Sequence, residues 1–276
     1  MSRVLRTYSG RSCVVTGAGS GIGRALSVEL AGRGARLALS DVDEGSVQQT
    51  AESCRGLGAQ VHTYRVDVAD RSAVFAHAEQ VVRDLGAVHL VVNNAGVALH
   101  GPVAELGEQD FRWLMDINFW GVVHGTQAFL PHLAASGSGQ LANVSSVFGL
   151  IAVPKQAAYN AAKFAVRGFT EALRQECQLD GTPVAVSCIH PGGVRTEIAR
   201  RARATASEDK AEMAQTFDKL ARTSPPRAAR TILKGLERER ARILVGPDAW
   251  FLAALPRALG AHYGRVITHG AARLEA

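Results

Sequence analysis

Short apolar runs rich in Val, Ile, Leu and Ala alternate along the chain with longer segments whose apolar residues recur at helical spacing. The runs lack the alternation of a half-exposed strand, which predicts strands that are buried on both faces of a sheet. Six strands are expected at Ser12–Thr16, Arg36–Ser40, Val61–Val66, Val88–Val92, Gln140–Ser145 and Val184–His190, and a seventh at Arg242–Val245.

Amphipathic helices are expected between the first strands, at Ile22–Arg33, Glu44–Leu57 and Arg71–Leu85. A glycine stands just beyond each helix, where a left-handed cap is needed: Gly34, Gly58 and Gly86. Alternating strands and helices give right-handed crossovers, so the predicted fold is α/β: a doubly wound parallel β-sheet with helices on both faces. Since no repeat or linker divides the chain, residues 1–276 are expected to form a single domain.

The composition is ordinary for a globular protein, with 47% hydrophobic and 20% charged residues. No segment approaches the roughly 18 uninterrupted apolar residues of a membrane span, and the basic start of the chain lacks the apolar stretch of a secretory signal. The four cysteines are widely separated and form no CxxC pair. We therefore expect a reduced, cytoplasmic protein without disulfides, a membrane span or a metal site.

The net charge of +6 is carried by one late segment. Residues 195–242 hold 13 Lys and Arg against 7 Asp and Glu, whereas residues 1–194 hold 15 against 16. A nucleic-acid partner is not expected, because the chain shows no basic stripe interleaved with aromatic residues and no nucleic-acid-binding motif.

A glycine-rich turn, Thr16–Gly23, joins the first strand to the first helix. Its glycines let the backbone approach a ligand, and the helix that follows begins with unpaired N–H groups and a partial positive charge. This position in a βαβ unit favours dinucleotide binding over a plain turn. The expected cofactor-binding residues of the turn are Gly17, Ser20, Gly21, Ile22 and Gly23.

Polar residues follow the next strands at the edge where ligands bind in such sheets. Asp41 ends the second strand, where a carboxylate accepts hydrogen bonds from a ribose diol and repels a 2′-phosphate. This predicts NAD rather than NADP, although Asp41 could instead cap a helix. Further cofactor contacts are expected from Asp67 and Val68 after the third strand, and from Asn94, Ala95 and Gly96 after the fourth.

Tyr159 and Lys163 stand four residues apart in a segment of good helix formers, so both side chains project from one helix face. A free tyrosine is a poor acid or base at neutral pH, but a nearby cation favours the phenolate. Alone, this spacing is more often an exposed helical pair. Its place after a strand that ends in serine favours acid–base catalysis.

That strand ends in Ser145 and Ser146, 14 and 13 residues before Tyr159. Ser146 is expected to hold the substrate oxygen, while Ser145 either competes for this role or satisfies local backbone groups. Asn118 lies in a strongly apolar helical segment, where a buried amide needs partners. It is either a satisfied core residue or the anchor of a water that links Lys163 to solvent.

Together these motifs resemble the short-chain dehydrogenase/reductase family, with its Rossmann fold, across about residues 12–196. The resemblance implies a catalytic tetrad of Asn118, Ser146, Tyr159 and Lys163, in which Lys163 binds the nicotinamide ribose and lowers the pKa of Tyr159. It also implies cofactor contacts from Tyr159, Lys163, Pro191, Gly192, Val194 and Thr196, and a homotetramer or homodimer paired through the helices around Asn118 and Tyr159. The expected reaction is hydride transfer between NAD and an alcohol or ketone.

Residues 195–224 are expected to form a substrate lid, and residues 247–276 a C-terminal extension in which Pro256 limits helix length. Its apolar cluster is expected to pack on a neighbouring subunit, a role favoured over binding to a membrane surface: Trp250, Phe251, Leu252 and Leu255. Apolar walls from Val147, Phe148, Val153 and Val194 favour a hydrophobic secondary alcohol or its ketone. Arginines in the lid either attract an anionic substrate or form a solvated face. Two alternatives remain: an NADP-dependent carbonyl or 3-oxoacyl-thioester reductase, and a dinucleotide-sensing regulator without enzymatic activity.

Overall fold

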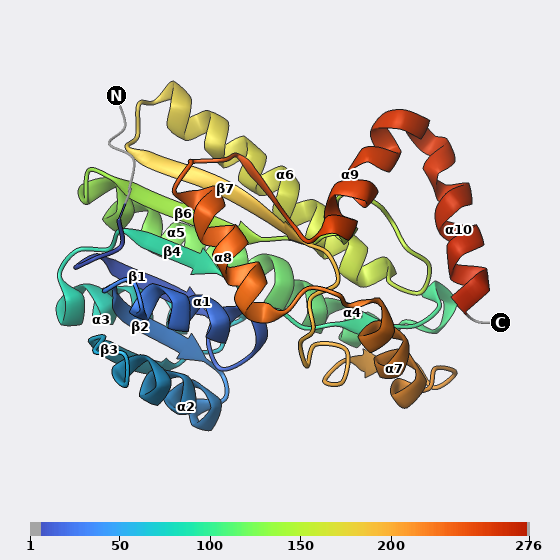
Figure 1. Cartoon of the computed structure of the whole chain (residues 1–276), viewed down its shortest axis with the longest axis horizontal. Helices are drawn as coiled ribbons and strands as arrows, with labels where there is room; N and C mark the ends of the chain where they lie inside the picture. The colour runs from blue at the N-terminus through green and yellow to red at the C-terminus, as the bar shows by residue number, and fades with distance from the viewer. Residues whose placement is uncertain (1–6, 275–276) are drawn as a thin grey trace.

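The strands form one seven-stranded parallel sheet in the order β3-β2-β1-β4-β6-β7-β9. The computed structural model describes residues 7–274 (Figure 1), so the basic start of the chain and the last two residues of the expected C-terminal extension lie outside it. The strand order reverses between β1 and β4, which opens a crevice at their carboxyl ends. The strands are β1 (Ser12–Thr16), β2 (Arg36–Asp41), β3 (Val61–Arg65), β4 (Leu90–Asn93), β6 (Gly139–Val144), β7 (Val184–Pro191) and β9 (Arg242–Val245).

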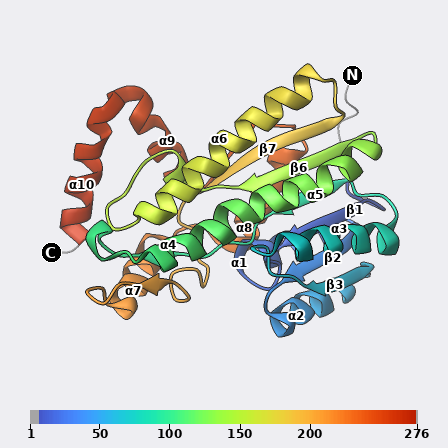
Figure 2. The same ribbon diagram turned by 180° about the vertical axis from the view of Figure 1, so that it is seen from behind.

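Helices cover both faces of this sheet, as the two opposite views show (Figures 1 and 2). One face packs against α1 (Gly21–Ala31), α2 (Glu44–Arg55) and α8 (Pro225–Leu236). The other face packs against α3 (Arg71–Leu85), α5 (Gly121–Ala135) and α6 (Ala157–Leu179). The doubly wound parallel sheet predicted from the sequence is therefore confirmed.

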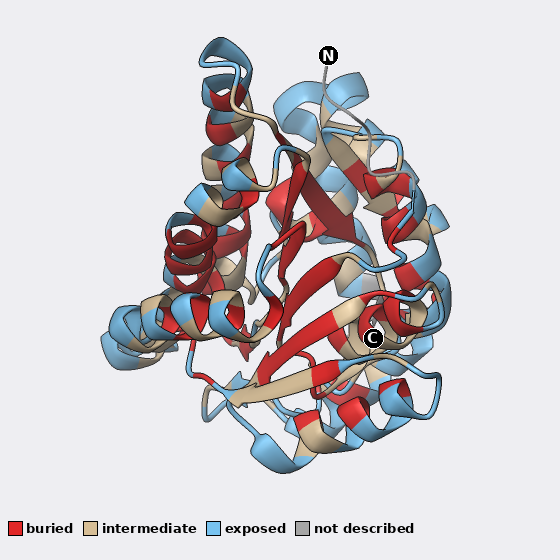
Figure 3. Ribbon diagram, turned by 90° about the vertical axis from the view of Figure 1, so that its left-hand side faces the viewer, coloured by how far each residue is buried: buried red, intermediate tan, exposed pale blue. Residues whose placement is uncertain are grey.

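The burial of both faces explains why the central strands β1, β4 and β6 have no exposed side. Val15 of β1 and Leu39 of β2 belong to the core under α1, while their neighbours Val14 and Ala38 belong to the core under α3. Figure 3 shows the central strands buried between helices whose outer faces are exposed. Each residue of β1 is removed from water, and a continuous apolar run is the result.

The predicted strands and helices are all present, with ends that differ by one or two residues. The three capping glycines have the predicted positive φ, at 76°, 84° and 78° for Gly34, Gly58 and Gly86. Smaller elements were not predicted: a parallel pair of two-residue strands, β5 (Leu99–His100) and β8 (Arg203–Ala204), and a π-helical turn, Asp116–Trp120, between α4 (Glu108–Met115) and α5.

Beyond β9 the chain forms two further helices, α9 (Pro247–Leu259) and α10 (Tyr263–Leu274), which make a bent hairpin beside the carboxyl ends of the strands (Figure 1). The prediction that Pro256 limits this helix was wrong, because α9 continues through Pro256 and ends before Gly260, whose φ is 54°. A proline in the last turn costs only one backbone hydrogen bond. No helix within residues 7–274 is both long and apolar enough to cross a membrane.

Candidate active site

Hydrogen bonds join the glycine turn after β1 to the loop after β4, at the crevice between these two strands. The Thr16 hydroxyl accepts hydrogen bonds from the backbone N–H groups of Asn94 and Ala95, at 3.0 and 3.1 Å. The side-chain Nδ2 of Asn94 donates hydrogen bonds to the carbonyl oxygens of Thr16 and Gly17, at 2.9 and 3.2 Å. The glycine turn is therefore held in place by the loop after β4.

The glycines of the turn are required by their surroundings. Gly17 and Gly21 have φ of 62° and 50°, a region that favours glycine. A Cβ on Gly17 would stand 2.7 Å from the Ala95 Cα, and one on Gly21 would stand 3.0 Å from the Thr196 side chain. A Cβ on Gly23 would collide with the Gly17 carbonyl. The turn therefore exposes the N-terminus of α1 in a cradle without side chains, which fits a pyrophosphate.

Asp41 lies beside this turn at the end of β2. Its Oδ2 accepts a hydrogen bond from the Gly19 N–H at 2.8 Å, and its Oδ1 accepts one from the Asp43 N–H at 3.1 Å. Ser20 caps α1 without a side-chain hydrogen bond to the helix. The sequence did not reveal that the Arg24 guanidinium also lies here, where it donates to the Gly19 carbonyl at 2.5 Å.

Asp67 and Val68 have different surroundings in the loop after β3. The Asp67 carboxylate is exposed and accepts a hydrogen bond from the Ala69 N–H, at 2.9 Å, in a local turn. Val68 is buried against α5, where a Cβ on Gly121 would stand 2.7 Å from its side chain. No hydrogen bond within residues 7–274 joins Asp67 to another predicted site residue.

Tyr159 and Lys163 lie on one face of α6, as their spacing predicts. The Lys163 Nζ lies 5.5 Å from the centroid of the Tyr159 ring and donates a hydrogen bond to the Val144 carbonyl at 3.1 Å. The Phe148 and Tyr159 rings pack at right angles, with centroids 6.1 Å apart. The phenol and the ammonium therefore meet beside the carboxyl end of β6.

The two serines after β6 have separate roles. The buried Ser145 hydroxyl donates to the Lys163 carbonyl at 2.8 Å and so fixes α6 to the strand. The Ser146 hydroxyl accepts the Phe148 N–H at 3.1 Å and interacts with the Tyr159 phenol. The His190 ring, with Nδ1 2.8 Å from the Ser146 carbonyl, fixes the backbone there. Ser146, and not Ser145, therefore faces the tyrosine.

Asn118 is fully buried in the π-helical turn, a distortion often found at functional sites. Its amide makes two hydrogen bonds to the backbone of Val97: Nδ2 donates to the carbonyl, and Oδ1 accepts from the N–H, both at 2.8 Å. A Cβ on Gly96 would stand 3.1 Å from this Oδ1 and 3.6 Å from the Lys163 Nζ. The Asn118 amide and the Lys163 ammonium therefore both lie next to Gly96, close to one another.

Burial shifts the pKa of both the Tyr159 phenol and the Lys163 ammonium. It raises the pKa of the Tyr159 phenol to about 12, and a hydrogen bond with the Ser146 hydroxyl opposes this rise. It lowers the pKa of the Lys163 ammonium to about 8. The lowered pKa of Tyr159 that the sequence predicts also relies on the positive charge of a bound nicotinamide, and burial acts on the phenol in the opposite direction.

The loop after β7 is anchored by a residue that the sequence did not single out. Asp248, in the first turn of α9, accepts a hydrogen bond from the Gly193 N–H at 2.6 Å, and its carboxylate stands where a Cβ on Gly192 would be. Val194 is buried and forms a bridge with Thr223. This loop continues to Thr196, which packs against the glycine turn.

The predicted lid includes β8 and α7 (Lys210–Leu220), and two of its arginines form ion pairs. Arg200 contacts Glu197 at 2.8 Å and Asp218 at 2.6 Å. Arg203 contacts Asp110 at 2.7 Å, and its guanidinium lies 3.7 Å from the centroid of the Trp113 ring. These contacts favour the solvated-face interpretation of Arg200 and Arg203 over recognition of an anionic substrate.

Comparisons with known proteins agree on one family. A family model described as short chain dehydrogenase matches residues 11–207. A Mycobacterium tuberculosis protein described as an oxidoreductase, SadH, is 51% identical over 98% of both chains. The 17-beta-hydroxysteroid dehydrogenase 13 of Mus musculus is 35% identical over 69% of this chain and 63% of its own. The crystal structure of a short chain dehydrogenase/reductase from Burkholderia phymatum in complex with NAD superposes with a TM-score of 0.85, at 31% identity over 91% of this chain and 94% of that chain.

Proposed function

The chain belongs to the short-chain dehydrogenase family, and from this premise we propose that it transfers hydride between NAD(H) and a hydrophobic secondary alcohol or its ketone. The family and its named relatives make the protein a nicotinamide-dependent oxidoreductase that acts on CH–OH groups. The proposal adds the choice of NAD, the substrate class and the role of each residue.

One observation carries the proposal: the Tyr159 phenol, which interacts with the Ser146 hydroxyl, and the Lys163 ammonium lie at the carboxyl end of β6, next to the loop of residues 94–96 that holds the glycine turn. Because the cradle leaves the N-terminus of α1 open, a dinucleotide bound there would extend toward Tyr159 along the crevice between β1 and β4. The side chains and the open backbone are suited to acid–base chemistry next to a bound cofactor.

The cofactor is proposed to be NAD, held through its pyrophosphate at Gly17, Gly21 and Gly23. Asp41 would accept hydrogen bonds from the ribose diol, and its negative charge would repel a 2′-phosphate. When bound, the nicotinamide ring accepts hydride from an alcohol or gives it to a ketone. The remaining proposed contacts are Ser20, Ile22, Asp67, Val68, Asn94, Ala95, Gly96, Tyr159, Lys163, Pro191, Gly192, Val194 and Thr196.

Tyr159 is proposed to move the proton at the substrate oxygen, and Ser146 to hold this oxygen by a hydrogen bond. With a pKa raised to about 12, the phenol is protonated at neutral pH, so it carries the proton that ketone reduction needs. For alcohol oxidation the phenolate must form, and positive charge from Lys163 and from the oxidised nicotinamide favours it. Both polar atoms of the Asn118 side chain are used by Val97, so a relay water would bind at the Asn118 backbone.

The substrate side of the site favours an apolar molecule. Val147 and Val194 are buried, while Val153 and Phe148 are half-buried near the serine and tyrosine. A hydroxysteroid dehydrogenase among the relatives has a name that fits a hydrophobic secondary alcohol. We therefore propose this class, and the ketone that corresponds to it, as the substrate.

A homodimer or homotetramer in the cytoplasm is proposed as the working form. Trp120, at the end of the π-helical turn, and Phe164, on α6, remain 47% and 39% exposed. Large apolar side chains at these positions support pairing of the helices around Asn118 and Tyr159. Light scattering after size exclusion should give a multiple of the 29.2 kDa chain mass, and Phe164→Glu should reduce it.

A screen of purified protein against alcohols and ketones, with each nicotinamide cofactor, tests the proposal. Absorbance of the reduced nicotinamide should change with NAD(H) and hydrophobic secondary alcohols or their ketones. Activity confined to NADPH and 3-oxoacyl thioesters would instead support the alternative reductase, for which Arg24 beside the turn is the favouring observation. Cofactor binding without turnover of any substrate would support the sensing regulator.

A further inference from the structure

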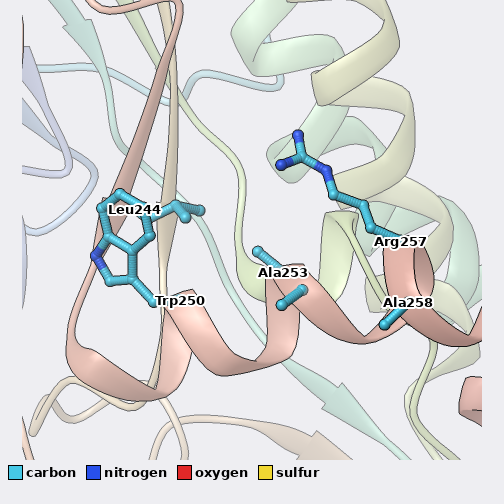
Figure 4. A pocket seen from close by; sticks show the side chains of 6 residues that line it. Leu244, Trp250, Ala253, Arg257 and Ala258 are labelled. Carbon is cyan, nitrogen blue, oxygen red and sulfur yellow. The ribbon is translucent and has the colours of Figure 1, made fainter.

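A groove lies between α9 and the edge strand β9, outside the proposed catalytic residues. It has a volume of about 400 Å³, which is within the range of small-molecule pockets. Figure 4 shows Leu244 and Trp250 at one end, Arg257 and Ala258 at the other, and Ala253 between them. Its lining consists of Leu244, Trp250, Ala253, Ala254, Arg257 and Ala258.

The groove is apolar along most of its length. Trp250 is 60% exposed, and Phe251 beside it is 63% exposed, so large apolar surfaces are left in water here. Ala253 and Ala254 also line the groove, and their small side chains leave space between α9 and β9. Covering such a surface with an apolar ligand is favourable by about 25 cal/mol for each Å² removed from water.

One charge stands at the far end of this groove. The guanidinium of Arg257 extends from α9 over the groove (Figure 4) and makes no ion pair or hydrogen bond with any residue of the described chain. The acidic residue of α9, Asp248, is bonded to the Gly193 N–H. The described part of α10 carries no Asp or Glu. Arg257 is exposed, so water solvates its charge in the free chain, and it has no carboxylate partner within the described residues, in contrast to Arg200 and Arg203 of the lid.

We propose that this groove binds an amphipathic carboxylate of the fatty-acid type. Its alkyl chain lies along Trp250, Leu244 and the alanines, and its carboxylate accepts two parallel hydrogen bonds from the Arg257 guanidinium. Trp250 and Arg257 are seven residues apart, or about 10 Å along a helix, which matches a medium-length chain. A neutral amphiphile would gain the same apolar contacts but would leave the arginine unpaired.

The site is separate from the proposed reaction centre but adjacent to it. Neither Tyr159 nor Lys163 lines the groove, whereas α9 packs against the turn Val147–Gly149 that follows Ser146. Binding there requires neither a cofactor nor turnover, so it is measured independently of the proposed function.

Isothermal titration calorimetry of the full chain without cofactor tests this site, with decanoate as the probe and decan-1-ol as its neutral match. We expect saturable one-to-one binding of decanoate. Arg257→Gln should weaken it by about three- to fivefold and leave decan-1-ol unchanged, since Arg257 is exposed and an exposed ion pair contributes at most about 1 kcal/mol. Arg257→Lys should give an intermediate loss, because it keeps the charge but not the paired geometry.

Two matched variants make the result specific. Arg265→Gln removes an exposed arginine of α10 outside the groove and should leave decanoate binding unchanged. Ala254→Phe fills the groove and should abolish binding of both probes. An equal loss with Arg265→Gln, or binding that survives Ala254→Phe, would overturn the proposal. Adsorption to phosphatidylglycerol vesicles without saturable decanoate binding would overturn it in favour of a membrane surface.

Discussion

Individual side chains set the protonation on which the proposed chemistry depends. Burial makes Tyr159 a weak acid, with a pKa of about 12, and makes Lys163 a weaker base than usual, with a pKa of about 8. The Ser146 hydroxyl opposes the effect of burial on the phenol. The residues alone therefore favour the neutral phenol, and an alcohol must meet a bound, positively charged nicotinamide before Tyr159 can act as a base.

Replacing Asp41 by Ala should change the cofactor preference. Without the carboxylate, NAD loses its proposed diol contact and NADP loses an electrostatic repulsion. The ratio of kcat/KM for NAD to that for NADP should fall by about 10- to 100-fold, since each charged contact contributes about 1.5–3 kcal/mol. Steady-state kinetics with both cofactors measures this ratio.

Asp43→Ala is the matched control for Asp41. Its carboxylate caps α2 through the Ser46 N–H at 3.1 Å, two residues beyond the proposed diol-binding position. The control should keep the preference of the native chain. A native preference for NADP, or an unchanged ratio in Asp41→Ala, would contradict the assignment.

At the residue scale, the sequence identified side chains but not their partners. The sequence did not decide between Ser145 and Ser146 as the residue that holds the substrate oxygen. Only the folded structure shows that the Ser145 hydroxyl donates a hydrogen bond to the Lys163 carbonyl. The sequence treated Asn118 as a water anchor or a core residue, and the structure ties its amide to Val97, 21 residues away. His190 carries no motif, because its role depends on meeting Ser146 across two neighbouring strands.

Among the elements, α9 does more than extend the chain. Its first turn supplies Asp248, which holds the Gly193 N–H and so positions the loop between β7 and Thr196. The pair β5–β8 ties the lid to the loop after β4, where the Arg203 N–H donates to the Ala98 carbonyl at 3.1 Å. Neither contact is visible in sequence patterns, because two-residue strands carry no periodicity and Asp248 lies 55 residues from Gly193.

Replacing Asp248 by Ala should loosen this loop. The change removes a hydrogen bond between a backbone N–H and a carboxylate, so the free energy of unfolding should fall by about 1–3 kcal/mol. The dissociation constant for NAD should rise about tenfold, since Gly192 and Thr196 are proposed cofactor contacts. Urea unfolding and calorimetric titration with NAD measure the two effects.

Asp218→Ala serves as the control, because Asp218 forms an exposed ion pair with Arg200. Exposed pairs contribute at most about 1 kcal/mol, so both quantities should stay near the native values. If Asp248→Ala lowers stability but leaves NAD affinity unchanged, Asp248 has a structural role only.

The larger elements were predictable for a physical reason. A sheet covered on both faces requires apolar residues at every position of a strand, and each crossover requires an amphipathic helix, so both leave strong patterns. The π-helical turn was not predictable, because the helical pattern of residues 108–135 continues through it. The hairpin of α9 and α10 was anticipated only as an extension.

For the molecule as a whole, a histidine buried in the core should lower the free energy of unfolding at acidic pH. His77 lies in the core under α3, between Tyr64 and Phe129, and both of its ring nitrogens are buried without a hydrogen-bond partner. Burial lowers its pKa to about 4. The unfolded chain therefore takes up a proton below about pH 6.5 that the folded chain does not, and stability falls as the pH drops toward 4.

His77→Phe should make the protein less sensitive to acid. Between pH 7 and pH 5 the native chain should lose about 2 kcal/mol of unfolding free energy through His77, and the variant should lose less by this amount. The loss through the buried His190, whose pKa is also about 4, remains in both proteins. Urea unfolding at the two pH values gives the difference, with His269→Phe on the exposed face of α10 as the control. Equal losses in the native chain and in His77→Phe would contradict this account.

The most direct test of the central claim replaces Tyr159 by Phe. We expect NAD to bind with an affinity within about twofold of the native value, while kcat for the best alcohol or ketone falls by about 10²- to 10⁴-fold, the contribution of a positioned acid–base group. Calorimetric titration and stopped-flow absorbance of the reduced nicotinamide measure the two quantities on one preparation. Turnover within tenfold of the native rate, with NAD still bound, would show that Tyr159 is not the group that moves the proton.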